Sequence, residues 1–349
     1  MTPTGVRATI LAMAGYVPGE QINDSDVVKL NSNENPYPPS PKVFEAVKAV
    51  LTGDKLRKYP QPHGDSFRKV AGRALNIDPD SILIGNGSDD ILTILTRTFV
   101  PEGGRIASFA PSYILYKSLA EIQGANFETV PFTSDWQLPP LTPLAGVHLT
   151  FLANPNSPTG TCVRLPEIER LATQTGGPLV LDEAYADFAE WNGLKLVGKV
   201  KNLIVTRSFS KYYALAGVRF GFAVAQPAVV RELLKVKDSY NCDVLSLAAA
   251  TAAIDDQAYY SELRSKLTAT RGRLSVGLAE LGFHITPSQA NFVWCRRSDQ
   301  QVKPIYEELT RRKVLIRYMS YPGYGDGLRV SVGTSAEVER LLRELKTIV

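Results

Sequence analysis

The chain has 349 residues, of which 44% are hydrophobic and 21% charged, so it can bury a large core and form two globular domains. Its net charge of +4 is mild, and short basic clusters such as 311–313 are expected to be solvated helix ends, so nucleic acid is not indicated as a partner. No stretch reaches the roughly 18 consecutive apolar residues of a membrane span, and the N-terminus lacks a secretory signal pattern, so we expect a cytoplasmic protein without a membrane partner.

The first 30 residues look irregular, and the Pro- and Asn-rich passage at 31–39 favours turns over regular structure. From residue 41 onward, short apolar runs alternate with stretches of helical periodicity. This pattern predicts strands at 81–84, 104–109, 147–152, 178–181, 202–207 and 221–225, and helices at 89–100, 114–123 and 166–175. Strands that alternate with helices predict an α/β fold with a largely parallel sheet covered on both faces.

A long helix is expected from 248 to 281, with a break near 255–256. The remainder has an α+β pattern, with strands at 291–295, 314–317 and 327–332 and helices at 303–312 and from 335 onward. We therefore expect an N-terminal arm (1–40), a large domain (41–245) and a small C-terminal domain (246–349). The three cysteines and three histidines are scattered, which predicts reduced thiols and no metal site.

Open α/β sheets bind ligands beyond the carboxyl ends of their strands, and the polar residues of interest fall at those ends. Gly87, Ser88 and Asp89 follow one strand and open a helix, where free N–H groups form either an anion site or an ordinary helix cap. Asp182 ends another apolar strand. It is either a turn carboxylate or a partner for a protonated ring nitrogen.

Lys211 lies in the run Ser208-Phe209-Ser210-Lys211, between aromatic residues and an apolar strand. Lysines are usually exposed, but this setting indicates partial burial, which favours the neutral amine that forms a Schiff base. The hydroxyls of Ser208 and Ser210, with the guanidinium of Arg219, could hold a phosphate. Together with Asp182, these groups match the needs of an aldehyde cofactor that carries a phosphate and a pyridine ring.

The pattern Ser-x-Ser-Lys followed by Gly-x-Arg-x-Gly, downstream of Asp-Glu-Ala-Tyr at 182–185, resembles the fold-type I pyridoxal-phosphate-dependent aminotransferases. The resemblance covers nearly the whole chain and is closest to the histidinol-phosphate aminotransferases. It implies a large domain with a mostly parallel sheet flanked by helices, and a small α+β domain. It also implies pyridoxal 5′-phosphate as cofactor and a homodimer with shared active sites.

The resemblance assigns roles to individual residues. Lys211 would bind the cofactor and move protons, Asp182 would face the ring nitrogen, and Tyr185 would contact the ring oxygen. The other implied cofactor contacts are Gly87, Ser88, Asp89, Ser208, Ser210 and Arg219 at the phosphate, Tyr113 over the ring, and Tyr59 from the neighbouring subunit. Relatives commonly carry Asn-Asn-Pro-Thr-Gly where this chain has Asn156-Ser157-Pro158-Thr159-Gly160, so either Asn156 or Ser157 could contact the ring oxygen.

Arg317 and Arg329 lie within apolar strands near the C-terminus and need anionic partners, either protein carboxylates or a ligand. By resemblance they would bind the carboxylate of glutamate in one half-reaction and the phosphate of histidinol phosphate in the other. Tyr16 resembles a tyrosine that folds over the substrate phosphate, and Asn33 lines the same entrance by analogy; both could instead be turn residues.

The expected function is a transaminase of histidine biosynthesis that exchanges an amino group between histidinol phosphate and 2-oxoglutarate. An aromatic amino acid aminotransferase is the first alternative, because aromatic side chains such as Tyr16 could contact a bare ring. A threonine-phosphate decarboxylase, which would share the phosphate end, is the second. A regulatory protein that binds the cofactor without turnover is disfavoured, since the chain has no spare length, roughly 60–80 residues, for the usual DNA-binding domain.

Overall fold

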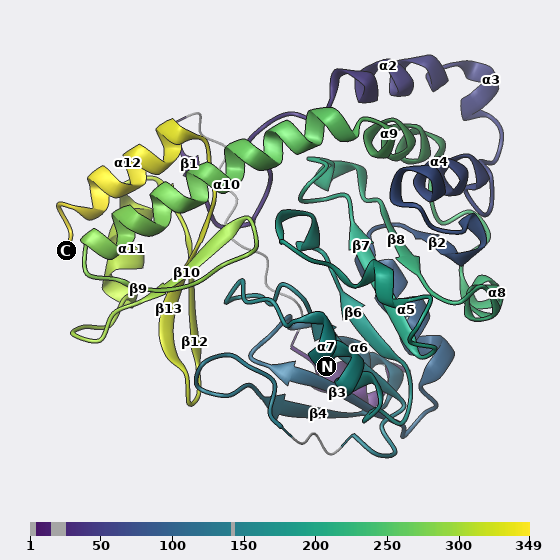
Figure 1. Cartoon of the computed structure of the whole chain (residues 1–349), viewed down its shortest axis with the longest axis horizontal. Coiled ribbons are helices and arrows are strands. Elements are labelled where there is room, and N and C mark those ends of the chain that lie inside the picture. The colour runs from purple at the N-terminus through teal and green to yellow at the C-terminus, as the bar shows by residue number, and fades with distance from the viewer. Residues whose placement is uncertain (1–4, 15–25, 141–143) are drawn as a thin grey trace.

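A seven-stranded sheet forms the centre of the larger of two globular parts (Figure 1). The computed structural model describes residues 5–14, 26–140 and 144–349. The strands lie in the order β2-β8-β7-β6-β5-β3-β4. Their bounds are β2 Ile82–Gly85, β3 Arg105–Ala110, β4 Asn126–Pro131, β5 Leu149–Ala153, β6 Leu179–Asp182, β7 Leu203–Ser208 and β8 Gly221–Val224. Strand β8 is antiparallel to both neighbours and the remaining pairs are parallel, so the expected α/β fold with a largely parallel sheet is confirmed.

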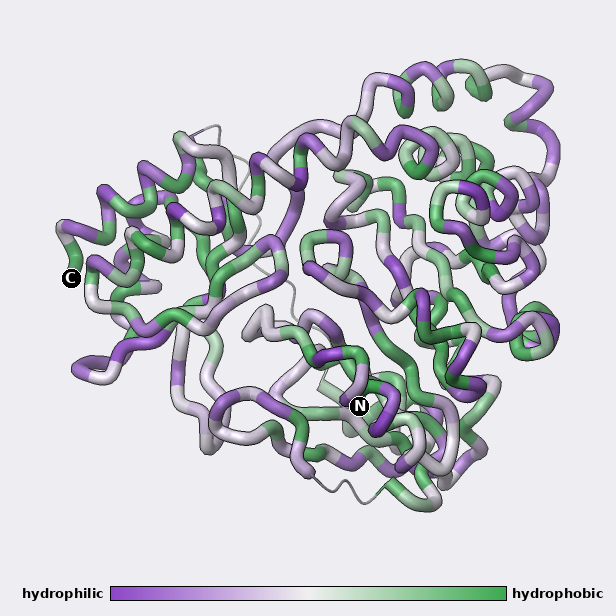
Figure 2. The backbone as a smooth tube through the Cα atoms, in the orientation of Figure 1, coloured by the Kyte–Doolittle hydropathy of each residue, from purple (hydrophilic) through white to green (hydrophobic). Residues whose placement is uncertain are grey.

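Both faces of this sheet are covered, because successive side chains of a strand point to opposite sides. In β6, Leu179 and Leu181 belong to one apolar cluster and Val180 to the other. One face packs against α5 (Ser88–Phe99), α6 (Leu115–Gln123) and α8 (Pro227–Val236), and the other against α4 (Asp65–Leu75), α7 (Leu165–Ala172) and α9 (Val244–Asp255). The central strands are accordingly buried along their whole length and largely hydrophobic (Figure 2).

The smaller part is built on an antiparallel sheet in the order β12-β13-β10-β9. Its strands are β9 His284–Thr286, β10 Phe292–Arg296, β12 Arg317–Tyr321 and β13 Gly325–Ser331. Its helices are α10 (Gln257–Glu280), α11 (Lys303–Arg311) and α12 (Ser335–Leu345). Strand β1 (Val28–Lys29) pairs in parallel with β11 (Val314–Leu315), which joins the N-terminal segment to this part. Helix α1 (Ala8–Ala12) instead lies against α6, since Arg7 donates to the carbonyl of Ile122.

The two parts are joined by α9 and α10, which meet at Asp256, so the expected break in the long helix is confirmed. Helix α9 packs against α4 and against α2 (Pro41–Val50), which precedes the short helix α3 (Gly53–Leu56). A division after residue 245 would separate α9 from these neighbours. We therefore propose that the domain boundary lies between α9 and α10.

Four strands of the described residues are absent from the sequence prediction: β1, β4, β9 and β12. Strand β1 has only two residues and lies in the part of the chain that was expected to be irregular. Strand β4 lies at the edge of the large sheet and none of its residues is buried, so it carries no apolar run. Strand β9 has three residues, too few for a periodic signal. The single strand expected at 314–317 is wrong: the chain leaves one sheet at Leu315 and enters another at Arg317.

Candidate active site

Asp182 ends β6 and lies in a buried polar setting, with 6% of the residue exposed. The hydroxyl of Tyr116 donates to Asp182 Oδ2 at 2.8 Å, and Thr206 Oγ1 donates to Oδ1 at 3.2 Å. Burial raises the pKa of the Asp182 carboxyl, and the hydrogen bond from Tyr116 acts against that rise. A carboxylate held in this way can pair with a cation such as a protonated ring nitrogen.

Lys211 and Tyr185 meet the same N-terminal segment. Lys211 is half-buried and its Nζ donates to the carbonyl of Ser32 at 3.0 Å. The hydroxyl of Tyr185 accepts a hydrogen bond from Nδ2 of Asn33 at 3.0 Å. The expected partial burial of Lys211 is confirmed, and the two side chains contact adjacent residues of one irregular segment.

The turn between β2 and α5 gathers groups that could hold an anion, and we call it the cradle. Gly87, with φ of 83°, precedes the first turn of α5, and the backbone N–H of Asn86 donates to Asp90. Arg219 adopts a left-handed backbone (φ 55°) and directs its guanidinium to Ser210 Oγ at 3.2 Å and to Asp89 Oδ2 at 3.5 Å. The helix N-terminus and the guanidinium together suit a phosphate.

Close packing supports this cradle. A Cβ at Gly87 would lie 2.8 Å from Arg219 Nη2, and one at Gly221 would lie 2.7 Å from the backbone nitrogen of Ser88. Ser208 and Ser210 are buried beside this turn, and the Ser210 N–H donates to Ser208 Oγ. The residues present therefore fit the phosphate end of the expected cofactor, because the donors converge on one turn that tolerates no bulk.

Tyr113 stands at the start of α6 and its hydroxyl donates to Asp89 Oδ1 at 3.3 Å. Its ring meets the ring of Tyr116 edge to face, with centroids 5.7 Å apart. Since Tyr116 also bonds Asp182, Tyr113 lies between the cradle and the buried carboxylate. From this place the Tyr113 ring could stack on a ring held between the two.

Asn156 and Ser157 have different surroundings. Asn156 is 2% exposed and is bonded within its own neighbourhood: Oδ1 accepts from Ser112, and Nδ2 donates to the carbonyl of Pro111 and to Thr159. Ser157 Oγ accepts from Arg329 Nη1 at 3.0 Å. Ser157 therefore borders the arginine, whereas Asn156 holds the loop.

Arg317 and Arg329 are directly paired across β12 and β13. Arg329 Nη2 also donates to the carbonyl of Asn31 at 3.0 Å, and its guanidinium lies over the ring of Phe292. Like charges opposite one another in a sheet repel, so this pair favours an anion between them. Asn31 and Ser157 place that anion site beside the segment that contacts Lys211.

Tyr59 does not join this constellation within the chain. Tyr59 is 80% exposed and stacks on Tyr240, with ring centroids 4.4 Å apart. Tyr16 lies outside the described residues.

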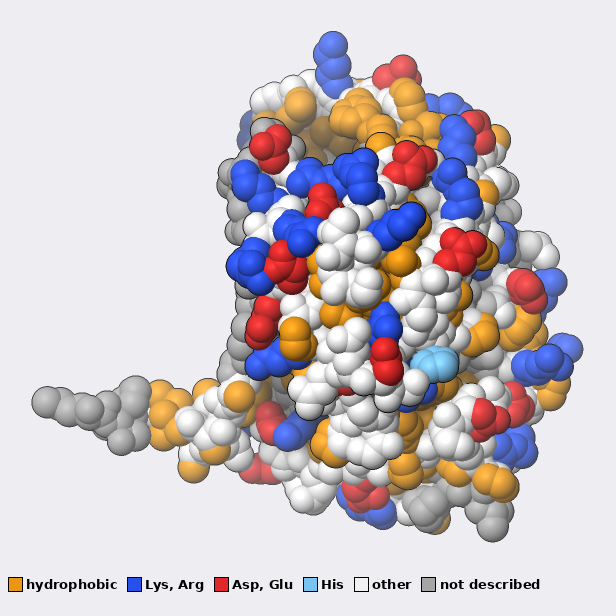
Figure 3. Space-filling model, turned by 90° about the vertical axis from the view of Figure 1, so that its left-hand side faces the viewer, with side chains coloured by type: hydrophobic (Ala, Val, Ile, Leu, Met, Phe, Trp, Pro, Cys, Tyr) orange, Lys and Arg blue, Asp and Glu red, His pale blue; other side chains and the backbone are white. Residues whose placement is uncertain are grey.

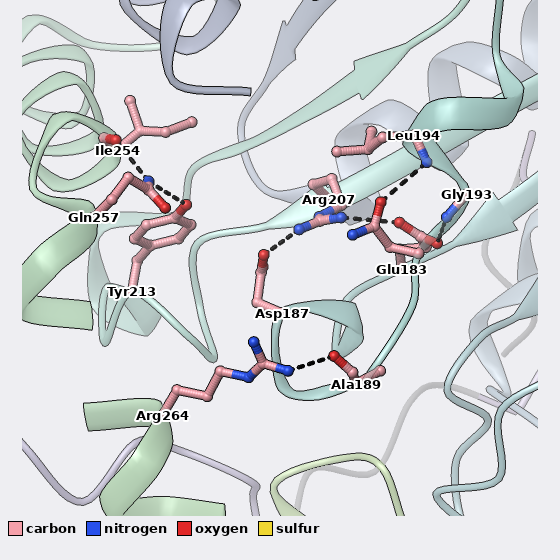
Figure 4. Close-up of polar contacts among 11 residues, drawn as sticks. Glu183, Asp187, Ala189, Gly193, Leu194, Arg207, Tyr213, Ile254, Gln257 and Arg264 are labelled. Atoms are coloured by element: carbon pink, nitrogen blue, oxygen red, sulfur yellow. Dashed lines mark hydrogen bonds and ion pairs between the residues drawn. The ribbon is translucent and has the colours of Figure 1, made fainter. Parts of the chain in front are cut away.

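A buried ionic network under the site is missing from the sequence analysis (Figure 4). Arg207 Nη1 bonds Glu183 Oε2 at 2.9 Å, and Nη2 pairs with Asp187. Glu183 also accepts from the N–H of Gly193, in the short helix η3 (Gly193–Leu196). The network ties β7 to the segment that carries Tyr185. One sequence signal was present: an arginine at the end of an apolar strand needs a buried acid, and Glu183 follows Asp182.

Within the described ranges, no three histidine, cysteine or acidic side chains are grouped to hold a metal, and no helix is long and apolar enough to cross a membrane. The face that the small domain presents carries Lys and Arg interspersed with Asp and Glu (Figure 3).

Comparisons with known proteins identify the family of the chain. Residues 25–345 match the family model "Aminotransferase class I and II". The chain is 50% identical to a histidinol-phosphate aminotransferase of Rhodopirellula baltica, covering 95% of this chain and 92% of that one, and 46% identical to one of Syntrophotalea carbinolica, covering 98% and 99%.

Solved structures share the fold. The histidinol-phosphate aminotransferase of Sinorhizobium meliloti, in complex with pyridoxal-5′-phosphate, superposes with a TM-score of 0.88 at 24% identity, covering 99% of each chain. A tetra mutant of Thermus thermophilus aspartate aminotransferase gives 0.83 at 19% identity, covering 99% of this chain and 100% of the other. The chain is thus a pyridoxal-phosphate-dependent transaminase of fold type I, and it belongs to the family of the histidinol-phosphate aminotransferases within the class I and II aminotransferases.

Proposed function

We propose that the chain exchanges an amino group between histidinol phosphate and 2-oxoglutarate, as a step of histidine biosynthesis. The observation that carries the choice of anionic substrates is the cross-strand pair Arg317 and Arg329, which borders the segment in contact with Lys211. Such a pair suits the carboxylate of glutamate and the phosphate of histidinol phosphate in turn. The names of relatives that are 42–50% identical over nearly the full length agree with this choice.

Pyridoxal phosphate supplies an aldehyde that accepts the amino group and a ring that withdraws electrons. We assign the covalent bond to Lys211 Nζ, which also moves the proton at the amino-bearing carbon of the substrate, first as base and then as acid. Asp182 would keep the ring nitrogen protonated, and Tyr185 would donate to the ring oxygen. The residues that would hold the phosphate are Gly87, Ser88 and Asp89 through their N–H groups, Ser208 and Ser210 through their hydroxyls, and Arg219.

Ser157 is assigned to the substrate side and Asn156 to the loop. The amide of Asn156 already bonds Pro111 and Thr159, whereas Ser157 meets Arg329. A serine in place of the commoner asparagine leaves the ring oxygen to Tyr185 in this chain. Tyr113 covers the ring from the side of α6.

The active enzyme is a homodimer in this proposal, with Tyr59 reaching the cofactor phosphate of the partner. Tyr59 is 80% exposed, and Phe44, Leu51 and Leu56 on the neighbouring helices are more than half exposed. An apolar patch of this kind favours burial against a second copy. Light scattering of the purified protein tests the dimer, and a monomer with full activity would contradict it. We also propose a cytoplasmic location, in keeping with three free cysteines.

The decisive experiment compares substrates. Glutamate with imidazole-acetol phosphate should be turned over faster than with phenylpyruvate, and phosphothreonine should release no carbon dioxide. A preference above about tenfold for either competitor, roughly 1.4 kcal/mol of transition-state binding, would overturn the substrate assignment.

Replacing Lys211 with alanine should abolish both turnover and the absorption band of the lysine–cofactor linkage, because no other amine is assigned to the cofactor aldehyde. Wild-type turnover by the Lys211→Ala variant would contradict the catalytic assignment.

A further inference from the structure

Asn33 is a buried residue at the junction of the two domains. It is 1% exposed and has a left-handed backbone, with φ of 54°, which asparagine tolerates better than most residues. Its backbone N–H donates to Ser331 Oγ at 2.8 Å, and its carbonyl accepts from Asn291 Nδ2 at 2.9 Å. The side chain therefore starts from a fixed backbone, and it reaches Tyr185.

Ser331 also fixes which way the amide of Asn33 faces. The Ser331 hydroxyl accepts from the Asn33 backbone N–H, so its own proton is left to donate, and Asn33 Oδ1 accepts that proton at 2.9 Å. In the opposite amide orientation an N–H would face this hydroxyl, and the Ser331 proton would lose the acceptor that Asn33 Oδ1 provides. Since Ser331 is 3% exposed, that loss would be unfavourable.

The amide orientation determines the direction of the Tyr185 hydroxyl. Asn33 Nδ2 donates to Tyr185 Oη at 3.0 Å, so one lone pair of that oxygen is occupied. A phenolic O–H has a single proton that lies near the plane of the ring, and the position that faces the amide would clash with an N–H. The proton must point away from Asn33, and a donated N–H also makes the phenol a stronger donor.

We propose that Asn33, oriented by Ser331, is a positioning residue that makes Tyr185 donate its proton to the ring oxygen of the cofactor. This inference rests on the proposed function, which places Tyr185 at that oxygen. It reassigns Asn33 from the substrate entrance to the control of a cofactor contact. Ser331 lies on β13 two positions from Arg329, so one strand of the small domain carries both the substrate arginine and the residue that orients Asn33.

The test uses the pH dependence of the visible absorbance of the holoenzyme. When the lysine–cofactor linkage loses its proton, the negative charge on the ring oxygen is no longer compensated. A hydrogen bond to the ring oxygen stabilises this deprotonated form, so the hydrogen bond lowers the pH midpoint of the absorbance change. In Asn33→Asp a carboxylate replaces the amide N–H, so Tyr185 donates to the new carboxylate instead of the ring. The midpoint should rise by about one to two pH units, the effect of losing one hydrogen bond to an ionised oxygen.

Two further variants make the test specific. Ser331→Ala frees the amide of Asn33 to turn, so it should raise the midpoint by less than Asn33→Asp does. This variant also provides the test if Asn33→Asp fails to fold. In the background of Tyr185→Phe, Ser331→Ala should leave the midpoint unchanged, because the donor is already gone and the substitution adds no charge. Asn76→Asp is the control for the backbone conformation: Asn76 is exposed, has φ of 55° and lies at the end of α4, so the midpoint of this variant should equal that of the wild type.

An unchanged midpoint in either Asn33→Asp or Ser331→Ala, where that variant folds and the wild type titrates normally, would overturn this inference alone. The inference also fails if the shift of Ser331→Ala persists in the Tyr185→Phe background. A wild-type protein that binds pyridoxal phosphate without any visible absorbance would overturn the proposed function, and this inference with it.

Discussion

Replacing Arg207 with methionine should destabilise the large domain strongly. The Arg207 side chain is 5% exposed, and its partners Glu183 and Asp187 are 0% and 14% exposed. Methionine keeps most of the apolar volume but leaves two acids at the centre of the network without their cation. Removing one partner of a buried ion pair in this way typically lowers the free energy of unfolding by about 3–5 kcal/mol.

The loss should also depend on pH. Burial raises the pKa of Glu183 to about 7 from an unfolded value of 4.5, while the Arg207 guanidinium acts in the opposite direction. Without Arg207 the folded-state pKa of Glu183 rises further. When folding raises the pKa of a carboxyl, the free energy of unfolding falls as the pH rises from the unfolded pKa to the folded pKa. Wild type and variant therefore lose stability in parallel up to about pH 7. Above that pH only Arg207→Met continues to lose stability, and the difference between the two should grow toward about pH 9.

Urea unfolding at fixed protein concentration, followed by tryptophan fluorescence, measures both effects. Arg311→Met is the matched control, because that arginine is 75% exposed in its pair with Glu308 and should change the free energy of unfolding by less than about 1 kcal/mol. Adding Glu183→Gln to Arg207→Met should recover most of the loss at high pH. A loss below about 1 kcal/mol, or one equal at about pH 6 and about pH 9, would refute the reasoning.

Two other variants probe the cofactor contacts. Gly87→Ala should weaken pyridoxal phosphate binding about tenfold in equilibrium dialysis, because its Cβ adds left-handed backbone strain and lies 2.8 Å from Arg219. Gly103→Ala is the control: Gly103 has φ of 72° and no neighbour within 4 Å, so this variant should bind the cofactor normally. Equal affinities of the two variants would contradict the cradle. Tyr116→Phe should lower kcat about tenfold or more with KM little changed, because Asp182 loses a hydrogen bond from a buried hydroxyl. Tyr306→Phe on α11 is the control. An unaltered kcat in Tyr116→Phe would show that its hydrogen bond to Asp182 does not support catalysis.

The structure brings together candidate site residues that are close together in the chain. The residues 208–211 and 219 lie at the end of β7 and in the short connection from β7 to β8, and Asp182 ends the neighbouring strand β6. Buried parallel strands give strong apolar runs, so the polar residues at their ends were visible from the pattern alone. The edge strand β4 has no buried face and was invisible for the same reason.

Contacts between distant segments could not be predicted in that way. The hydroxyl of Tyr116 reaches Asp182 across the sheet, and Ser331 bonds Asn33 from the far end of the chain. No local pattern records such a pair, because the two partners lie far apart in the sequence. The stacking of Tyr59 on Tyr240 is likewise a property of two loops brought together by the fold.

The contacts of segment 31–35 explain why its composition is so unusual. The carbonyls of Asn31 and Ser32 accept hydrogen bonds from Arg329 and Lys211, and Asn35 Nδ2 donates to the carbonyl of Lys211. A strand or helix would occupy those carbonyls with its own hydrogen bonds, so the segment must be irregular to offer them to both domains. Asparagine and proline suit such a backbone because they favour turns and resist regular pairing. The Pro/Asn-rich passage therefore follows from its position between the lysine of one domain and the arginine of the other.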